Sequence, residues 1–152
     1  SFGSSLLHIR EEQSSGTAGG TFTQGAWRTR VLNTVKTNEI TGASLGSNQI
    51  TLPAGTYWID ADTGAHIVEQ NGLRLYNTSD SSVALYGEPR FTQTWNVENG
   101  GGLTGRFTIA AEKVFEVQHY CTVTNAGDGF GYAIVGVSQI EVHADVKIWK
   151  VS

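Results

Sequence analysis

Residues 47–67 read S-N-Q-I-T-L-P-A-G-T-Y-W-I-D-A-D-T-G-A-H-I, and this stretch decides the fold class. It contains two strand candidates, Gln49–Leu52 and Thr56–Ile67, joined by Pro-Ala-Gly. Proline cannot donate to a strand ladder and glycine tolerates a positive φ, so this tripeptide predicts a tight turn. From Tyr57 onward, apolar and polar side chains alternate over eleven residues. A period of two with an acidic outer face predicts a sandwich strand, with the core on one side.

Composition and charge narrow the class of protein further. The chain has 152 residues, 19 glycines, only two prolines and 16% charged residues, which is typical of one all-β domain with many turns. The formal net charge of −4 and the absence of any Lys/Arg cluster argue against nucleic acid as a partner. No apolar run approaches the roughly 20 residues that span a bilayer, so we expect no membrane insertion. A start at Ser1 without any methionine indicates the C-terminal fragment of a longer fibrous protein.

The rest of the chain repeats the same pattern of short alternating segments separated by turns. About ten strands at this spacing predict an antiparallel jelly-roll sandwich over residues 1–152, since no segment has helical periodicity. The remaining strand candidates are Leu6–Glu11, Trp27–Leu32, Gly72–Asn77, Val83–Tyr86, Arg90–Trp95, Leu103–Ala110, Val114–Thr124, Phe130–Val137 and Val142–Val151.

Several of these segments resemble a known family. The run L-P-A-G-T-Y-W-I, the long F-E-V-Q-H-Y-C-T-V strand, the glycine-flanked G-F-G-Y-A-I-V-G and the closing I-E-V-H-A-D-V-K-I-W-K-V are similar to C1q and tumour-necrosis-factor-like jelly rolls. The closing Ile-Trp-Lys-Val and the W-R-T-R-V-L-N-T-V segment resemble the C-terminal head domains of bacteriophage tail fibres and virion proteins. The cysteine pattern of many animal members is missing, which favours the phage-like branch.

The resemblance implies a homotrimer and places the first, last and long penultimate-region strands together in the sheet that meets the other subunits. Aromatic residues on strand faces turned away from the core favour the same conclusion, because they indicate a buried partner surface. The alternative is scattered surface aromatics on a monomer. The residues expected at the interface are His8, Val114, Gln118, Tyr120, Thr122 and Trp149.

Candidate chemical groups do not form a recognisable catalytic frame, so we expect a non-enzymatic protein without a cofactor. His119 and Cys121 share one strand face, where a nucleophile or metal pair is conceivable, but that face is the predicted core. Asp60 and Asp62 imitate the start of a calcium loop without its twelfth-position glutamate. His8 could hold an axial metal ion if threefold symmetry repeats it. Calcium and an axial ion are therefore weak alternatives.

The function predicted is that of a trimeric head of a phage tail fibre or similar virion appendage, located outside the cell or on the virion surface. It would bind a host-surface glycan or protein receptor through the loops 77–82, 86–90, 95–103 and 125–130. A cytokine-like ligand for a protein receptor and a glycan-cleaving appendage with paired carboxylates remain alternatives. The residues expected to contact the receptor are Tyr86, Trp95, Asn96, Asn99 and Phe130.

Overall fold

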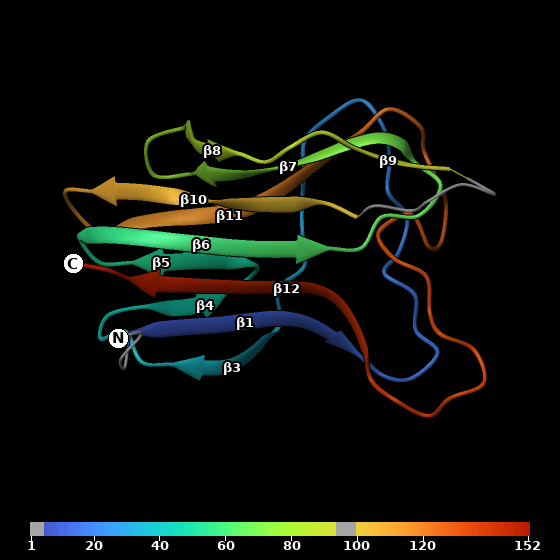
Figure 1. Cartoon of the computed structure of the whole chain (residues 1–152), viewed down its shortest axis with the longest axis horizontal. Helices are drawn as coiled ribbons and strands as arrows, with labels where there is room; N and C mark the ends of the chain where they lie inside the picture. Colours follow the sequence, from blue (N-terminus) through green and yellow to red (C-terminus); the bar gives the residue numbers. More distant parts are fainter. Residues whose placement is uncertain (1–4, 94–99) are drawn as a thin grey trace.

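The computed structural model describes residues 5–93 and 100–152, and within them the chain forms twelve β-strands and no helix (Figure 1). No described segment could therefore cross a membrane as a helix. The strands are β1 (Leu6–Gln13), β2 (Arg28–Thr29), β3 (Thr34–Asn38), β4 (Ser44–Gly46), β5 (Gln49–Leu52), β6 (Gly55–Thr63), β7 (Glu69–Asn77), β8 (Ser82–Tyr86), β9 (Arg90–Thr92), β10 (Gly102–Ile109), β11 (Lys113–Cys121) and β12 (Glu141–Lys150).

Two antiparallel sheets pack face to face, which confirms the predicted all-β sandwich. The five-stranded sheet has the order β10-β6-β12-β1-β3, and the seven-stranded sheet has the order β4-β5-β11-β7-β8. Strand β2 adds to β11, and β9 adds to β7. Strands β1 and β12 pair antiparallel, so the two chain ends lie at one end of the sandwich and long loops gather at the other (Figure 1).

Strand β6 follows the alternation read from the sequence. Tyr57, Ile59 and Ala61 are buried between the sheets, as predicted. The Tyr57 hydroxyl donates a 2.6 Å hydrogen bond to the Pro53 carbonyl, which ties the predicted turn to the strand. The strand ends at Thr63, earlier than expected, and the backbone soon afterwards enters the left-handed region at Ile67 (φ 52°), which a pleated strand cannot accommodate.

The main core fills the space between the sheets, and a second cluster lies beneath the loops. Phe115 and Val117 of β11 are fully buried in the main core, on the face predicted to point inward. The second cluster contains Phe22, Ala65, Val68 and Cys121, with Phe130 packed against it. The loop end of the sandwich therefore has its own apolar interior.

One predicted strand, Phe130–Val137, is wrong. The segment belongs to a long loop between β11 and β12, because glycines with positive φ (Gly127, 85°; Gly136, 84°) turn the backbone away from a ladder. The Phe130 amide donates to the Gly20 carbonyl instead of to a neighbouring strand. The candidate Trp27–Leu32 is also reduced to the two residues of β2.

Two strands were missed by the sequence pattern. Strand β4 forms a hairpin with β5 through Ser47 and Asn48, whose φ angles of 51° and 63° are those of a tight two-residue hairpin turn. Strand β3 is an edge strand that pairs only with β1. Both are short and mostly polar, so neither produces a strong alternation.

Candidate functional site

The outward face of the five-stranded sheet carries a row of one aliphatic, two aromatic and one basic side chain across four strands. Because the side chains of paired residues lie side by side, the register places them in one line perpendicular to the strands. The row consists of Leu6 (β1), Trp149 (β12), Trp58 (β6) and Arg106 (β10). Trp58 is 43% exposed, although its strand neighbours Tyr57 and Ile59 are fully buried. An aromatic row is thus left outside a completed core.

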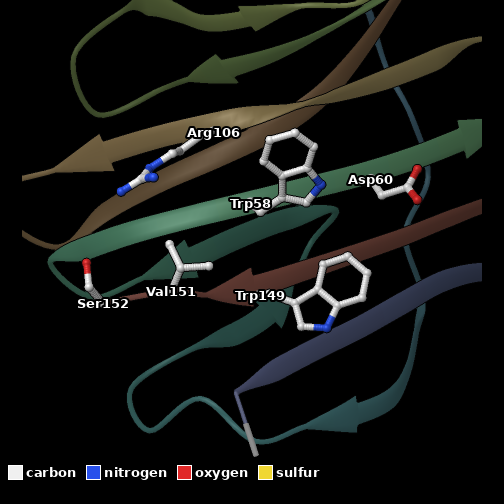
Figure 2. Close-up of a pocket in the computed structure, with 6 residues that line it drawn as sticks. All are labelled: Trp58, Asp60, Arg106, Trp149, Val151 and Ser152. Atoms are coloured by element: carbon white, nitrogen blue, oxygen red, sulfur yellow. The ribbon is translucent and has the colours of Figure 1, made fainter. Parts of the chain in front are cut away.

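A shallow pocket of about 560 Å³ lies over this row. Figure 2 shows the two indoles projecting side by side from β6 and β12, with Arg106 on β10 beyond them. Val151 and Ser152 border the pocket at the end of the chain, and Asp60 borders it on the next row. The surface is mainly aromatic and aliphatic, with one acid and one base among its described lining residues.

The same face becomes charged further along the strands. His8 Nε2 lies 2.6 Å and Arg10 Nε lies 3.0 Å from the same Asp145 oxygen, Oδ1, and Lys147 Nζ lies 3.2 Å from Oδ2. Partial burial opposes ionisation of Asp145, but hydrogen bonds from these three side chains outweigh it and lower its pKa to about 2. The pKa of Asp62 is raised, first by burial and then by repulsion from neighbouring aspartates. The face therefore mixes apolar, basic and acidic groups.

The residues predicted for the subunit interface divide between the two sheets. His8 and Trp149 lie on the outward face just described, with the first and last strands adjacent as expected. The expectation that the long strand shares their sheet is wrong, because β11 lies at the centre of the seven-stranded sheet. The chain folds β11 between β5 and β7, pairings that are distant in sequence. Val114, Gln118, Tyr120 and Thr122 therefore belong to the opposite side of the sandwich.

The outward face of the seven-stranded sheet has an aromatic cluster of its own. The Trp27 ring centroid is 5.6 Å from that of Tyr120 and 6.2 Å from that of Tyr86, with interplanar angles of 51° and 50°. The Arg74 guanidinium lies 4.3 Å from the Trp27 centroid and 4.6 Å from the Tyr76 centroid. We call Trp27, Arg74, Tyr86 and Tyr120 the outer aromatic cluster.

The predicted receptor-contacting residues have different surroundings. Tyr86 is 64% exposed and belongs to the outer aromatic cluster. Phe130 stacks on Phe22 with a 4.2 Å centroid separation and lies beneath the Arg30 guanidinium, so its ring packs within the chain. Trp95, Asn96 and Asn99 lie outside the described residues.

The predicted receptor loops do not share one end of the sandwich. The turn at 77–82 lies at the end with the chain termini, whereas the loop at 125–130 lies at the opposite end (Figure 1). At that opposite end the β11–β12 loop exposes aliphatic residues, and Val135 is 90% exposed. The other large apolar residues exposed in this loop are Tyr132, Ile134, Val137 and Ile140.

A buried polar cluster joins the two sheets near the loop end. The Arg30 side chain is 1% exposed and donates to the carbonyl oxygens of Gly64, Phe130 and His143. Glu11, 3% exposed, lies 3.9 Å from its guanidinium. Burial lowers the pKa of Arg30 to about 10, partly opposed by Glu11, so the guanidinium stays charged at neutral pH. Arg30 therefore ties the backbone at Gly64, Phe130 and His143 together.

His119 and Cys121 lie in the interior, as the sequence pattern predicts. His119 Nε2 is 2.8 Å from the Asn71 side-chain oxygen, and burial with the nearby Arg30 charge lowers its pKa well below the ordinary value. Burial raises the pKa of the Cys121 thiol, which donates to the Val123 carbonyl. A neutral imidazole and a protonated thiol, both engaged within the core, are poorly suited to nucleophilic chemistry.

The weak metal candidates are separated by basic residues. Lys147 pairs with both His8 and Asp60 in the register and so lies between them. Within residues 5–93 and 100–152, no group of three or more histidine, cysteine or acidic side chains is arranged to hold a metal ion. A calcium site or an ion shared by three copies therefore stays a prediction from the sequence.

Comparison with solved structures supports the fold. The sequence matches no family profile, and no curated protein matches it. The crystal structure of murine APRIL at pH 5.0 superposes with a TM-score of 0.53 at 8% identity, covering 97% of this chain and 98% of that chain. The structure of murine APRIL at pH 8.5 gives 0.52 at 10% identity with the same coverage. The fold is a tumour-necrosis-factor-like jelly roll. The expected fold class is confirmed, whereas identities this low carry no functional conclusion.

Sequence reasoning missed three of the residues that define these surfaces. Trp58 was placed on the acidic face of its strand, where a large aromatic residue among aspartates was itself a signal of a covered surface. Trp27 and Arg74 were not singled out, because their proximity depends on a loop folding over β7 and β11. The contact between Trp27 and Arg74 therefore cannot be predicted from the sequence around either residue.

Proposed function

We propose that the chain is a non-enzymatic binding head that assembles as a closed trimer through the outward face of its five-stranded sheet. The observation that carries the proposal is the Trp58–Trp149 row. Both indoles lie outside a core that is already filled by Tyr57, Ile59 and Ile148. Folding of one chain leaves Trp58 43% exposed and Trp149 half-buried, and contact with another copy would remove the remaining aromatic surface from water.

The charges around the row support a second copy as its occupant. Arg106 and Asp60 border the same pocket, and the face continues into a mixture of basic and acidic side chains around Asp145. A surface that carries both signs can meet a copy of itself with opposite charges opposed. The tumour-necrosis-factor-like fold supports a ring of three, and an obligate ring of this kind buries more than about 2,000 Å².

The biological role that we favour is attachment of a virion appendage, such as a phage tail fibre, to a host surface. The resemblance of the closing strand to phage head domains supports it. Such a domain acts outside the cell or on the virion surface, and its partners are two further copies of itself and a receptor.

A cytokine-like ligand for a protein receptor is the second candidate. The shared jelly roll with murine APRIL favours it, although the likeness concerns the fold. Labelled protein incubated with panels of bacterial and animal cells distinguishes the two roles. Saturable binding confined to bacteria supports the virion role, and binding confined to animal cells supports the cytokine-like role.

A glycan-cleaving role is less well supported. Retaining and inverting glycosidases need two carboxyl groups about 5 to 10 Å apart across a groove. The pocket over the tryptophan row has a single carboxylate, Asp60, among its described lining residues. We therefore favour a head that binds its receptor without cleaving it.

The assembly is tested by Trp58→Glu and Trp149→Glu. Each places a carboxylate in the centre of the proposed interface, and we expect the dissociation constant to rise by at least about 100-fold, a typical loss at an interface hot spot. The matched control is Val135→Glu, which introduces the same charge at a residue that is 90% exposed at the loop end.

Light scattering after gel filtration should give single folded chains for the two tryptophan variants and three chains for the control and wild type. Circular dichroism verifies that the variants keep their strands. Equal masses for all four proteins would overturn the proposed interface.

A further inference from the structure

We propose that the outer aromatic cluster on the seven-stranded sheet is a binding site for an uncharged, pyranose-containing glycan. The inference deepens the proposed function, because it rests on the receptor-binding role and names the site and the ligand class. The cluster lies on the sheet opposite the proposed assembly face, so trimer formation through that face leaves it accessible.

The shape of the cluster suits a sugar ring. Trp27, Tyr86, Pro89 and Tyr120 border a depression of about 300 Å³ that is mainly apolar. The Trp27 ring is tilted by about 50° from both tyrosines, so neither tyrosine stacks flat on the indole. A pyranose has an apolar face of C–H bonds that packs on such rings, while its hydroxyl groups point outward around the edge.

Polar groups at the rim can meet those hydroxyls. Gln70 uses its backbone N–H and C=O to bond with Thr122. The exposed side-chain carboxamide of Gln70 makes no hydrogen bond to any described residue. The hydroxyls of Tyr86 and Tyr120 likewise have no hydrogen bond within the described residues. An aromatic base with free amide and hydroxyl groups at its rim is the arrangement expected for a ligand with one apolar face and many hydroxyls.

The absence of charge in the depression selects the class of glycan. Its described lining residues include no acidic or basic side chain. Arg74 belongs to the cluster but does not line the depression: its guanidinium lies against the Trp27 and Tyr76 rings, and its Nε donates to the Gln118 side-chain oxygen at 2.8 Å. A sialic acid carboxylate or a sulfate would be desolvated here with no basic side chain among the described lining residues to pair with it. Neutral hexoses and N-acetylhexosamines carry no such cost.

A hydrogen-bonded base holds the cluster in position before a ligand arrives. Gln118 Nε2 donates to Glu116 at 2.9 Å, and the same carboxylate accepts from Thr29 at 2.8 Å and from Gln49 at 3.1 Å. Burial would raise the pKa of Glu116, but these three donors outweigh it and lower the pKa. The ionised carboxylate thus fixes Gln118, which fixes Arg74 beneath the indole. Such preorganisation reduces the entropy lost on binding.

The loop that carries Trp27 is also anchored. Arg28 donates from Nε to the Thr23 carbonyl at 3.0 Å and from Nη2 to the Gln24 carbonyl at 3.1 Å. Strand β2, directly after Trp27, pairs with β11 through Gln118 and His119. The indole is therefore placed by backbone contacts on one side and by Arg74 on the other.

The probe is an array of neutral oligosaccharides built from glucose, galactose, mannose and N-acetylglucosamine, with sialylated and sulfated glycans on the same slide. Wild type should bind one or more neutral structures. For the strongest of these, Trp27→Ala should weaken binding about tenfold or more in calorimetric titration, because a stacked aromatic contact is lost. Tyr86→Ala, at an exposed strand end, provides a second variant that should fold normally and weaken binding several-fold.

Tyr132→Ala is the matched control, because this exposed tyrosine lies on the β11–β12 loop and not in the outer aromatic cluster. The glycan affinity of this variant should equal that of wild type. The proposal is overturned if no neutral glycan binds, if only acidic glycans bind, or if the Trp27 and Tyr86 variants bind as wild type does. Cell binding that survives enzymatic removal of surface glycans would also overturn it, in favour of a protein receptor.

The mass of each sample is measured in parallel, so that the two proposals fail separately. A single chain that binds a neutral glycan through Trp27 contradicts the trimer and retains the glycan site. A trimer that binds no neutral glycan contradicts the site and retains the trimer.

Discussion

The two outward faces of the sandwich both carry tryptophan, but they present it differently. On the five-stranded sheet, Trp58 and Trp149 are neighbours on regular strands and lie beside a field of mixed charges. On the seven-stranded sheet, Trp27 comes from a loop and is tilted against two tyrosines over an uncharged depression. The first surface is suited to another large, charged surface, and the second to a small neutral ligand.

The difference shows how a sandwich can separate assembly from recognition. The register between β6 and β12 determines that Trp58 and Trp149 are neighbours, so every copy of the chain presents the same row. The outer aromatic cluster depends instead on side-chain bonds from Arg74 and Gln118. Changes that disturb the fold should affect both faces, whereas changes on one face should leave the other intact.

The largest effect is expected at Arg30, which lies between the sheets and supports both faces. Arg30→Met leaves the Glu11 carboxylate buried without its cation and three carbonyls without a donor. We expect a loss of about 3–5 kcal/mol in the free energy of unfolding. Urea denaturation at fixed protein concentration measures it.

The control for Arg30 is Lys113→Met, which breaks an exposed ion pair with Asp80. Surface pairs of this kind contribute less than about 1 kcal/mol. If the Arg30 variant lost no more stability than this control, the buried cluster would not be what joins the two sheets.

A smaller effect, confined to the five-stranded sheet, is expected from Asp145. Its pKa is about 2 in the folded chain against an ordinary value of 3.8, so the ionised carboxylate stabilises the fold above about pH 4. That contribution is lost as the pH falls through the interval from about 4 to 2. Unfolding free energies of wild type and Asp145→Asn, measured from pH 6 to pH 2, should therefore converge toward the acid end.

If the unfolding free energies of wild type and Asp145→Asn differed by the same amount at every pH, the prediction would be contradicted. The contacts of Asp145 with His8 and Arg10 would then add no stability that depends on its ionisation. The glycan affinity of Asp145→Asn should match that of wild type, because the outer aromatic cluster lies on the other sheet.

The fold was predictable where the pattern was local and strong. The inward face of β6 and that of β11 follow from alternation alone. The alternation in Trp27–Leu32 was real but did not indicate which face is buried, and the structure buries Arg30 and Leu32 while Val31 is partly exposed. An arginine at the centre of a core cannot be inferred from apolar periodicity.

The sites depended on information that the sequence pattern lacks. Tyr120 and Thr122 were expected at an interface because they point away from the core, yet which sheet takes β11 is decided by pairings with β5 and β7. Phe130 lies in a glycine-rich segment typical of an exposed loop, but the second cluster around Phe22 buries its ring. The alternation predicted which side chains of a strand point outward. It did not predict which residues of other strands and loops lie beside them on the surface.

In the proposed assembly, the tryptophan row closes three copies into one particle. Sedimentation equilibrium of the wild-type protein, from about 1 µM upward, measures it most directly. A trimer has a mass of about 49 kDa, three times the 16.3 kDa of one chain, and we expect this mass across the whole range. A stable, monodisperse 16.3 kDa species at these concentrations would contradict it.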